Sequence, residues 1–415
     1  MVAMPGRWFG FGFNQFGQVV NRRECEGDGK VLGPVAVTVH SLGKAGQWPS
    51  GGSCLRKLSP AWSHTACLAD DGSIYVFGFV DGRPWQQMCI SNQANQGCVD
   101  ILSSEKYLFM LWQDRVECRD IQNLSTGEVK GDLIWVKQLK EGEKQCTALP
   151  LIPDGYVTTT LPFYKPLAPQ LCTRKLALGS EHAVLLSTGF TVYSWGSGRH
   201  GQLGHGGVED ETEPRIVEAL HGLAMAEIAA GGWHSVCSSV SGDLYVWGWN
   251  ESGQLGLPAK SCSEEKHRKT PQQKRLSGEV SPSLSEANNT VIKSANKITG
   301  LGDSNVFISI QAFPALLDLP EELEVSKVSC GSRHSAAVTR EGKLFTWGWA
   351  VWELAQNQQL GDLLSYHGHC FPQCFPEHTF GDSSLSWGSL FQAATNTWAE
   401  RLFSRFLCSN SGCVG

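Results

Sequence analysis

The sequence predicts an all-β propeller, which is a ring of sheets built from one repeated hairpin. A segment around His182 recurs around His234 at an offset of 52 residues, and each copy ends in a Trp-Gly pair. The chain contains 46 glycines, whereas charged residues make up only 18% of it, and this composition suits short strands joined by tight turns. A fixed period is typical of repeat architectures, in which one unit cannot bury its own apolar face.

The amino terminus carries only the end of a repeat. Residues 11–19 have the spacing of residues 247–255, with Phe in place of Trp. A propeller that shares one blade between its two termini begins with such a half-repeat. Residues 21–57 are polar and glycine-rich, and we expect them to form a loop with one strand at 35–39.

Four copies of the repeat are well preserved, at 58–79, 176–204, 228–256 and 328–349. In each copy a His precedes the aromatic residue of a Trp-Gly or Phe-Gly pair by 13 residues. This spacing predicts a β-hairpin with an apolar strand after the His, a glycine turn, and a second strand rich in aromatic residues. The glycines expected to supply the positive φ of these turns are Gly72, Gly189, Gly242 and Gly342.

Between the first and the second of these copies, the repeat is degenerate. The gap of 118 residues between His64 and His182 leaves room for two blades or for one blade with insertions. Within residues 80–171 we expect one hairpin at 108–118 and another that joins 133–136 to 156–160. The later polar tract 259–300 is predicted to be a disordered loop, after which the sheet resumes at 307–310.

The propeller is expected to span residues 1–349, because the motif breaks off there. Residues 350–415 contain neither the His-to-Trp spacing nor another Gly-Gln-Leu-Gly run, which predicts a replacement ending outside the repeat. Their His and Cys residues are irregularly spaced and lack Cys-x-x-Cys, so an unfolded tail is favoured over a zinc site. The residues of zinc-ligand type are His367, His369, Cys370, Cys374, His378, Cys408 and Cys413.

The run Trp-Gly-x-Asn-x-x-Gly-Gln-Leu-Gly at 247–256, preceded by Gly-x-x-His at 231–234, resembles the regulator of chromosome condensation repeat. The resemblance covers roughly residues 8–349 and implies a seven-bladed β-propeller with several degenerate blades. It also implies a role in chromatin regulation or chromosome segregation. The implied location is the nucleus, with the cytoplasm as an additional one. Function follows less directly than fold, because this propeller serves many purposes.

The repeated His and Trp residues predict structure and not chemistry. Equivalent residues of different blades cannot converge on one substrate, so we expect the His side chains to be hydrogen-bonded between strands and the Trp side chains to fill blade cores. We predict no catalytic, cofactor-binding or metal site, since phosphate-loop, Gly-x-Ser-x-Gly and His-Glu-x-x-His motifs are missing. The residues assigned to structure are His64, His182, His234, His334, Trp195, Trp247 and Trp347.

Loop residues that differ between the copies are the candidates for binding. They stand directly before the motif His or after the Trp-Gly pair, where they would share one face of the ring. Trp and Arg at such places are common binding anchors. The predicted interaction residues are Ser63, Glu181, Arg199, His200, Trp233, Trp249 and Arg333.

The charge balance favours a protein partner. The formal net charge of -6 argues against a general nucleic-acid binder, and no window of about 18 apolar residues predicts a membrane span. The acidic stretch 209–213 would meet a basic partner, and the basic cluster 266–275 is a candidate nuclear import signal. The resemblance implies that the partners are histones or a chromatin-modifying enzyme, and we expect the propeller to bind them as a monomer.

Three classes of function remain open. The favoured class is a non-catalytic scaffold that binds chromatin-associated proteins. The second is guanine nucleotide exchange on a Ran-like small GTPase, for which the sequence offers no matching wedge insertion. The third is a recruiting subunit of a ubiquitin-ligase or trafficking complex, for which no appended catalytic domain is evident.

Overall fold

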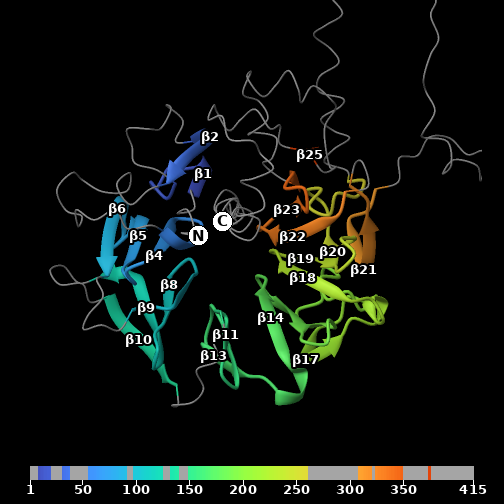
Figure 1. The fold of residues 1–415 in the computed structure, drawn as a ribbon, viewed down its shortest axis with the longest axis horizontal. Coiled ribbons are helices and arrows are strands. Elements are labelled where there is room, and N and C mark those ends of the chain that lie inside the picture. The colour runs from blue at the N-terminus through green and yellow to red at the C-terminus, as the bar shows by residue number, and fades with distance from the viewer. Residues whose placement is uncertain are drawn as a thin grey trace, which may run out of the picture.

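The computed structural model describes residues 8–19, 30–37, 55–90, 97–124, 131–139, 148–259, 307–319, 323–348 and 373–374. Their strands form six sheets of three or four strands and one sheet of two strands. The sheets are arranged around a common centre, as the blades of a propeller are (Figure 1). The predicted fold class, an all-β propeller, is therefore confirmed.

The six larger sheets are called blades 1 to 6 in chain order. Blade 1 consists of β3 (Leu55–Pro60), β4 (His64–Ala69), β5 (Ile74–Val80) and β6 (Arg83–Ile90). Blade 2 consists of β7 (Asp100–Ser103), β8 (Tyr107–Leu111), β9 (Arg115–Leu124) and β10 (Gly131–Gln138). Blade 3 consists of β11 (Leu151–Ile152), β12 (Gly155–Val157) and β13 (Tyr164–Pro166), and a 3-10 helix, η3 (Pro169–Leu171), follows it.

The second half of the ring is more regular. Blade 4 consists of β14 (Thr173–Leu178), β15 (His182–Ser187), β16 (Val192–Gly196) and β17 (Glu211–Ile216), followed by η4 (Glu218–Leu220). Blade 5 consists of β18 (Met225–Ala230), β19 (His234–Ser239), β20 (Leu244–Trp249) and β21 (Ile310–Leu317). Blade 6 consists of β22 (Val325–Cys330), β23 (His334–Thr339), β24 (Leu344–Gly348) and β25 (Gln373–Cys374).

The expected count of seven blades is wrong for the described residues, which form six. The seventh sheet contains only β1 (Trp8–Phe13) and β2 (Lys30–Val37). The reason lies in the sequence, because the amino-terminal half-repeat carries one motif strand and no His-bearing strand. The segment after β1 nevertheless docks on blade 1, where the Thr65 hydroxyl donates a 2.7 Å hydrogen bond to the Gln18 carbonyl.

All four hairpins predicted from the His-to-aromatic spacing are confirmed, and in each the His pairs with the Gly of the Trp-Gly or Phe-Gly pair. Three of the four turn glycines have the expected positive φ, but Gly189 does not. Phe190 takes that conformation with a φ of 62°, and its N–H bonds to the Ser187 carbonyl as the Gly242 N–H bonds to Ser239. The 52-residue period aligns Phe190, not Gly189, with Gly242.

The degenerate region contains two blades. The hairpin expected at 108–118 is confirmed as β8 and β9. The second expected hairpin is wrong, since residues 133–136 lie in β10 and pair with β9, while β12 pairs with β11 and β13. A local turn at Asp154, which has a φ of 63°, lets β12 fold back on β11 instead.

The expected disordered loop and the expected replacement ending fall mostly outside the described residues, which omit 260–306, 349–372 and 375–415. The sheet resumes with β21, so the strand expected from residues 307–310 begins at Ile310. β25 pairs with β24, and blade 6 thus takes its last strand from beyond residue 349. β2 overlaps the strand expected at 35–39.

Buried His side chains link neighbouring blades. His182 Nε2 of blade 4 lies 2.9 Å from Ser235 Oγ of blade 5, and His234 Nε2 lies 2.9 Å from Ser335 Oγ of blade 6. Ser235 in turn donates to the Gln202 carbonyl at 2.9 Å. Because that serine's single hydroxyl proton is used there, His182 must donate through Nε2–H.

Burial keeps these imidazoles neutral. It lowers the pKa of His64 to about 3, that of His182 to about 4 and that of His234 to about 3. The ring of His234 also packs against the backbone of Gly231, where a Cβ atom would stand 2.2 Å from Cε1. The glycine three residues before the His is therefore required by the packing of the ring.

The motif Trp residues fill the space between successive blades. Trp247 and Trp347 are fully buried, and Trp195 is buried as well. Trp247 packs among Val184 and Leu186 of the preceding blade, and its Nε1–H donates to the Gln202 carbonyl at 2.9 Å. One backbone carbonyl of blade 4 thus receives hydrogen bonds from two strands of blade 5.

Charged residues at one position of the first strand add a further link between blades. Lys175 and Lys327 place Nζ atoms 2.5 and 3.0 Å from the carboxylate oxygens of Glu227, which lies between them. Lys57 and Asp100 form the corresponding pair of blades 1 and 2. Burial opposes ionisation of Glu227, but the two ammonium groups outweigh it and lower its pKa.

We expect Gly231→Ala to destabilise the protein by about 1–3 kcal/mol, because the new methyl group would collide with the His234 ring and with the Gly331 carbonyl. Urea unfolding measures the change. The control is Gly189→Ala, where the nearest atom to the new Cβ is Ser187 Oγ at 3.6 Å. Equal stability of the two variants would contradict the packing described for the His ring.

The buried His residues predict acid sensitivity. Unfolding exposes them and restores a pKa near 6.5, so the unfolded state binds more protons and the native state loses stability as pH falls below that value. Below pH 6.5, each such His should lower the free energy of unfolding by about 1.4 kcal/mol per pH unit, until the pH reaches the pKa of that His in the native state. The free energy of unfolding, measured from pH 7 to pH 5, should fall less steeply in His234→Asn; parallel curves would count against this origin.

Candidate functional site

In blades 4 and 5 the strand order places two loops on one face of the ring. The loop between the first and second strands precedes the motif His, and the loop between the third and fourth strands follows the Trp-Gly pair. Backbone hydrogen bonds join these loops, as from Ser197 N to the Glu181 carbonyl and from Trp249 N to the Trp233 carbonyl. We call this side the loop face, and the side of the hairpin turns the turn face.

An aromatic cluster, defined as His200, Trp233, Trp249 and Arg333, lies on the loop face. The two indole rings meet edge to face with centroids 5.5 Å apart. The imidazole of His200 lies 6.0 Å from Trp233 and 5.8 Å from Trp249, and the Arg333 guanidinium lies 5.1 Å from the Trp249 ring centre. Three consecutive blades contribute to it, and all four side chains are half-buried.

The inter-blade hydrogen bonds determine where His200 lies. The backbone N–H of His200 donates to the Gln202 side-chain oxygen at 2.9 Å, and the Gln202 carbonyl is held by Ser235 and Trp247 of the next blade. The loop that carries His200 is therefore attached to blade 5, next to Trp249. The core of the ring thus sets the geometry of the cluster.

The other predicted interaction residues are placed differently. Arg199 donates to Glu181 at 2.8 Å, and this exposed ion pair belongs to blade 4 on the same face. Ser63 belongs to blade 1, is buried, and lies 3.5 Å from the Nδ1 atom of His64. The structure therefore brings four of the seven predicted residues into direct contact, pairs two more beside them, and leaves Ser63 apart.

The arrangement is suited to binding. Trp and Arg side chains that are half-buried on a rigid surface resemble the anchors of protein interfaces, and a cation over an indole ring contributes about 0.5–1 kcal/mol. Within the described ranges, no three His, Cys, Asp or Glu side chains are grouped so that they could hold a metal ion. No helix that the structure describes has the length and hydrophobicity of a membrane span.

A second aromatic group on the loop face was not predicted from the sequence. Phe16 lies 6.4 Å from Trp62 and 5.6 Å from Phe79 between ring centres. The repeat offered a way to find it, because Phe79 follows Phe-Gly as Trp249 follows Trp-Gly. Blade 1 thus carries an aromatic residue at the position that Trp249 occupies in blade 5.

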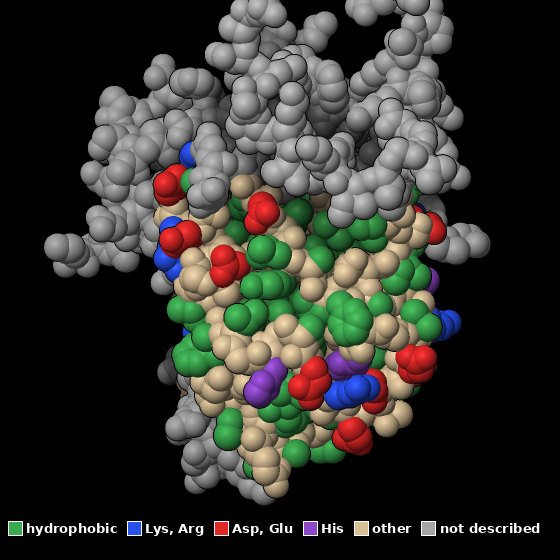
Figure 2. All heavy atoms as spheres, turned by 90° about the vertical axis from the view of Figure 1, so that its right-hand side faces the viewer, with side chains coloured by type: hydrophobic (Ala, Val, Ile, Leu, Met, Phe, Trp, Pro, Cys, Tyr) green, Lys and Arg blue, Asp and Glu red, His purple; other side chains and the backbone are tan. Residues whose placement is uncertain are grey.

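An apolar strip on the rim of the ring was also not predicted. Ile310, Phe313 and Leu316 of β21 are exposed by 42%, 55% and 53%. Figure 2, which faces this side of the molecule, shows hydrophobic side chains gathered across it, with acidic, basic and His side chains around them. The sequence contains no motif there, because the strip follows the polar tract and departs from the repeat.

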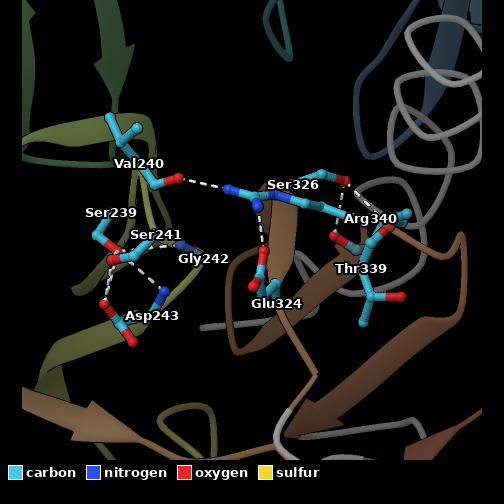
Figure 3. A network of polar contacts seen from close by, with 10 residues as sticks. Ser239, Val240, Ser241, Gly242, Asp243, Glu324, Ser326, Thr339 and Arg340 are labelled. Carbon is cyan, nitrogen blue, oxygen red and sulfur yellow. Dashed lines mark hydrogen bonds and ion pairs between the residues drawn. The ribbon is translucent and has the colours of Figure 1, made fainter.

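The turn face of blades 5 and 6 has a different character. Arg340 bridges the two blades by donating to the Glu324 carboxylate and to the Val240 carbonyl (Figure 3). Hydrogen bonds from Ser241 and Ser239 to Asp243 close the neighbouring turn and lower the pKa of that carboxyl. These polar groups bond to one another, so this face provides a reference surface for binding experiments.

Comparison with known proteins identifies the repeat. A family model described as the regulator of chromosome condensation (RCC1) repeat matches residues 191–238 and 241–282, and a second model of the same description matches 226–254 and 325–350. RCC1 domain-containing protein 1 of Mus musculus is 41% identical over 358 residues, covering 83% of this chain and 85% of that protein. The Homo sapiens protein of the same name is 41% identical over 366 residues with the same coverage.

Among solved structures, Prp20p from Saccharomyces cerevisiae has a similar fold. It superimposes with a TM-score of 0.58 at 14% identity, covering 91% of this chain and 87% of that one. The structure of Prp20p is described together with its binding to Gsp1p and histones. At this identity the similarity supports the propeller fold alone.

Proposed function

The chain belongs to the regulator of chromosome condensation (RCC1) repeat family, and from that membership we propose that it is a non-catalytic propeller scaffold for chromatin-associated proteins. Its partners are histones or a chromatin-modifying enzyme, and it acts in chromatin regulation or chromosome segregation as a monomeric propeller. It is located in the nucleus, also in the cytoplasm, and the basic residues 266–275 serve as its import signal.

The aromatic cluster is the observation that supports this proposal most strongly. Its two Trp rings and the Arg333 guanidinium are held by three blades, so they lose little conformational freedom when a partner binds. The Glu181 and Arg199 side chains flank the cluster and can exchange their mutual ion pair for contacts with a partner. A protein surface is the ligand class that such a half-buried, mixed patch fits.

The charge of the loop face supports a basic partner. Glu209 and Asp210 follow the loop of His200, and Glu251 lies exposed after Trp249. With a formal net charge of -6, the chain as a whole attracts cationic proteins. Histones have that chemistry, and histone binding is described for Prp20p, whose fold is similar.

Two other functions are kept as alternatives. Guanine nucleotide exchange on a Ran-like GTPase is the second candidate, and the described binding of Prp20p to Gsp1p is what favours it. A recruiting subunit of a ubiquitin-ligase or trafficking complex is the third. The three differ in what the loop face binds, so one set of variants tests them together.

We expect Trp233→Ala combined with Trp249→Ala to remove most chromatin-associated proteins captured from a nuclear extract by the full-length chain. Loss of two central Trp anchors should weaken binding at least about thirtyfold, because truncation of even one such residue costs about 2 kcal/mol or more. Quantitative mass spectrometry measures the loss. Phe190→Ala, which removes an exposed aromatic ring from the turn face, is the matched control and should retain the partners.

Unchanged capture by the double Trp variant, with an intact thermal unfolding transition, would contradict the proposed binding face. Partners drawn only from cytosolic or membrane complexes would favour the third function. A nucleotide-release assay with a Ran-like GTPase distinguishes the second function, nucleotide exchange, from the other two, since a scaffold should leave the release rate at its intrinsic value. Accelerated release that the Trp variant abolishes would replace the scaffold proposal with exchange activity.

A further inference from the structure

We propose that the partner surface continues from the aromatic cluster over the rim of blade 5 along β21, and that this rim strip binds a basic amphipathic helix of the partner. The rim strip is defined as Ile310, Phe313 and Leu316. The inference rests on the proposed binding function and names the partner segment that the propeller recognises.

The rim strip is continuous with the aromatic cluster. Ile310 pairs with Trp249 across the β20–β21 ladder, and Ile310 also contacts the loop of His200, where its Cγ2 atom lies 3.0 Å from the Cβ position of Gly201. Phe313 is the next member of the rim strip, and its ring lies over Gly206 of the same loop. Trp249, Ile310 and Phe313 therefore follow one another along the border between β21 and the loop of blade 4.

The three apolar side chains lie on one side of β21. Ile310 and Phe313 contact the loop of blade 4, whereas Leu317 contacts Gly256 and faces blade 6. Since neighbouring residues of a strand point in opposite directions, Leu316 lies on the side of blade 4 with the other two. The β20–β21 ladder has a bulge between the pairs Val246–Ala315 and Gly248–Gln311. Phe313 lies within this bulge of β21, which turns its side chain toward that same side.

The backbone edge of β21 is poorly suited to strand addition. Pro314 lacks an N–H group, and the Ala312 carbonyl already accepts a hydrogen bond of 3.0 Å from Gly206 N. A partner must therefore dock through side chains. Because of the bulge, the step from Ile310 to Leu316 lies opposite only the step from Trp249 to Tyr245 on β20. At about 3.3 Å per residue, successive members of the rim strip are therefore about 7 Å apart on average, which equals about four residues of a helix.

Acidic residues border the rim strip and define the charge of the partner. Glu209 follows Val208, which is itself 49% exposed, in the loop beneath Phe313, and Glu218 lies in η4, which contacts β21. Neither carboxylate forms an ion pair with the described residues. A helix with an apolar residue about every four positions along one face and Lys or Arg on its flanks would match both features.

The test uses the full-length chain and a fluorescein-labelled helical peptide, with Leu at every third or fourth position along one face, Lys at the flanking positions and Ala elsewhere. Fluorescence anisotropy should show saturable binding. Phe313→Ser combined with Leu316→Ser should weaken binding at least about tenfold, and Glu209→Lys with Glu218→Lys should weaken it and reduce its salt dependence. Val240→Ser, an equally exposed apolar residue on the turn face, is the matched control.

Peptides with Glu in place of Lys, or with Ser in place of Leu, should not bind. Equal binding of the Ser peptide, or of the Phe313 and Leu316 variant, would overturn the inference. If that variant binds the peptide normally while the Trp233 and Trp249 variant still loses its nuclear partners, the rim inference fails and the proposed function stands. A wild-type dimer that the rim variant converts to monomers would assign the strip to a second copy instead.

The chain's own basic residues 266–275 are the remaining occupant to be tested, since they lie in the segment that connects β20 to β21, the strand that carries this strip. A variant lacking residues 262–300 should bind the peptide as the full chain does. Peptide binding that appears only after this deletion would assign the strip to that tract and overturn the proposal.

Discussion

Blades 4, 5 and 6 depend on one repeated hydrogen-bond chain, in which a buried His of one blade donates to a hydroxyl of the next and that hydroxyl donates to a carbonyl of the first. His182, Ser235 and the Gln202 carbonyl form it between blades 4 and 5. Each bond contributes only about 1 kcal/mol net, but a broken member leaves a buried polar group whose desolvation costs about 1–3 kcal/mol. This hydrogen-bond chain therefore specifies the register of neighbouring blades more strongly than its net stabilisation suggests.

This constraint extends from the core to the surface. The carbonyl that ends the chain belongs to the loop of His200, so the bond that joins two blades also brings His200 to Trp233 and Trp249. Arg333 of blade 6 completes the aromatic cluster. Because three blades each contribute part of it, the cluster requires an assembled ring. The rim strip extends the same surface, since Ile310 touches both Trp249 and the loop of His200.

The sequence predicted what the repeat encodes locally. The His-to-Trp spacing identified four hairpins, because each lies within one copy of the motif. It failed where pairing was not local: β10 joins β9 and not the segment at 156–160, since a turn at Asp154 forms a closer hairpin. It selected Trp233 and Trp249 as interaction residues because they vary between copies, and the structure brings these two rings together. It also selected Ser63, which lies against His64 and is buried. The rim strip could not be predicted from the sequence, because β21 follows a long insertion and has no motif of its own.

A double-mutant cycle between His182 and Ser235 tests the inter-blade chain most directly. The free energies of unfolding of His182→Asn, Ser235→Ala and the double variant, measured at pH 7, separate their coupling from the cost of each change. The hydrogen bond predicts a coupling of roughly 0.5–1.5 kcal/mol, with the double variant less destabilised than the sum of the single variants. Additive effects would mean that the two side chains are merely adjacent, and the account of how the blades are held would then be contradicted.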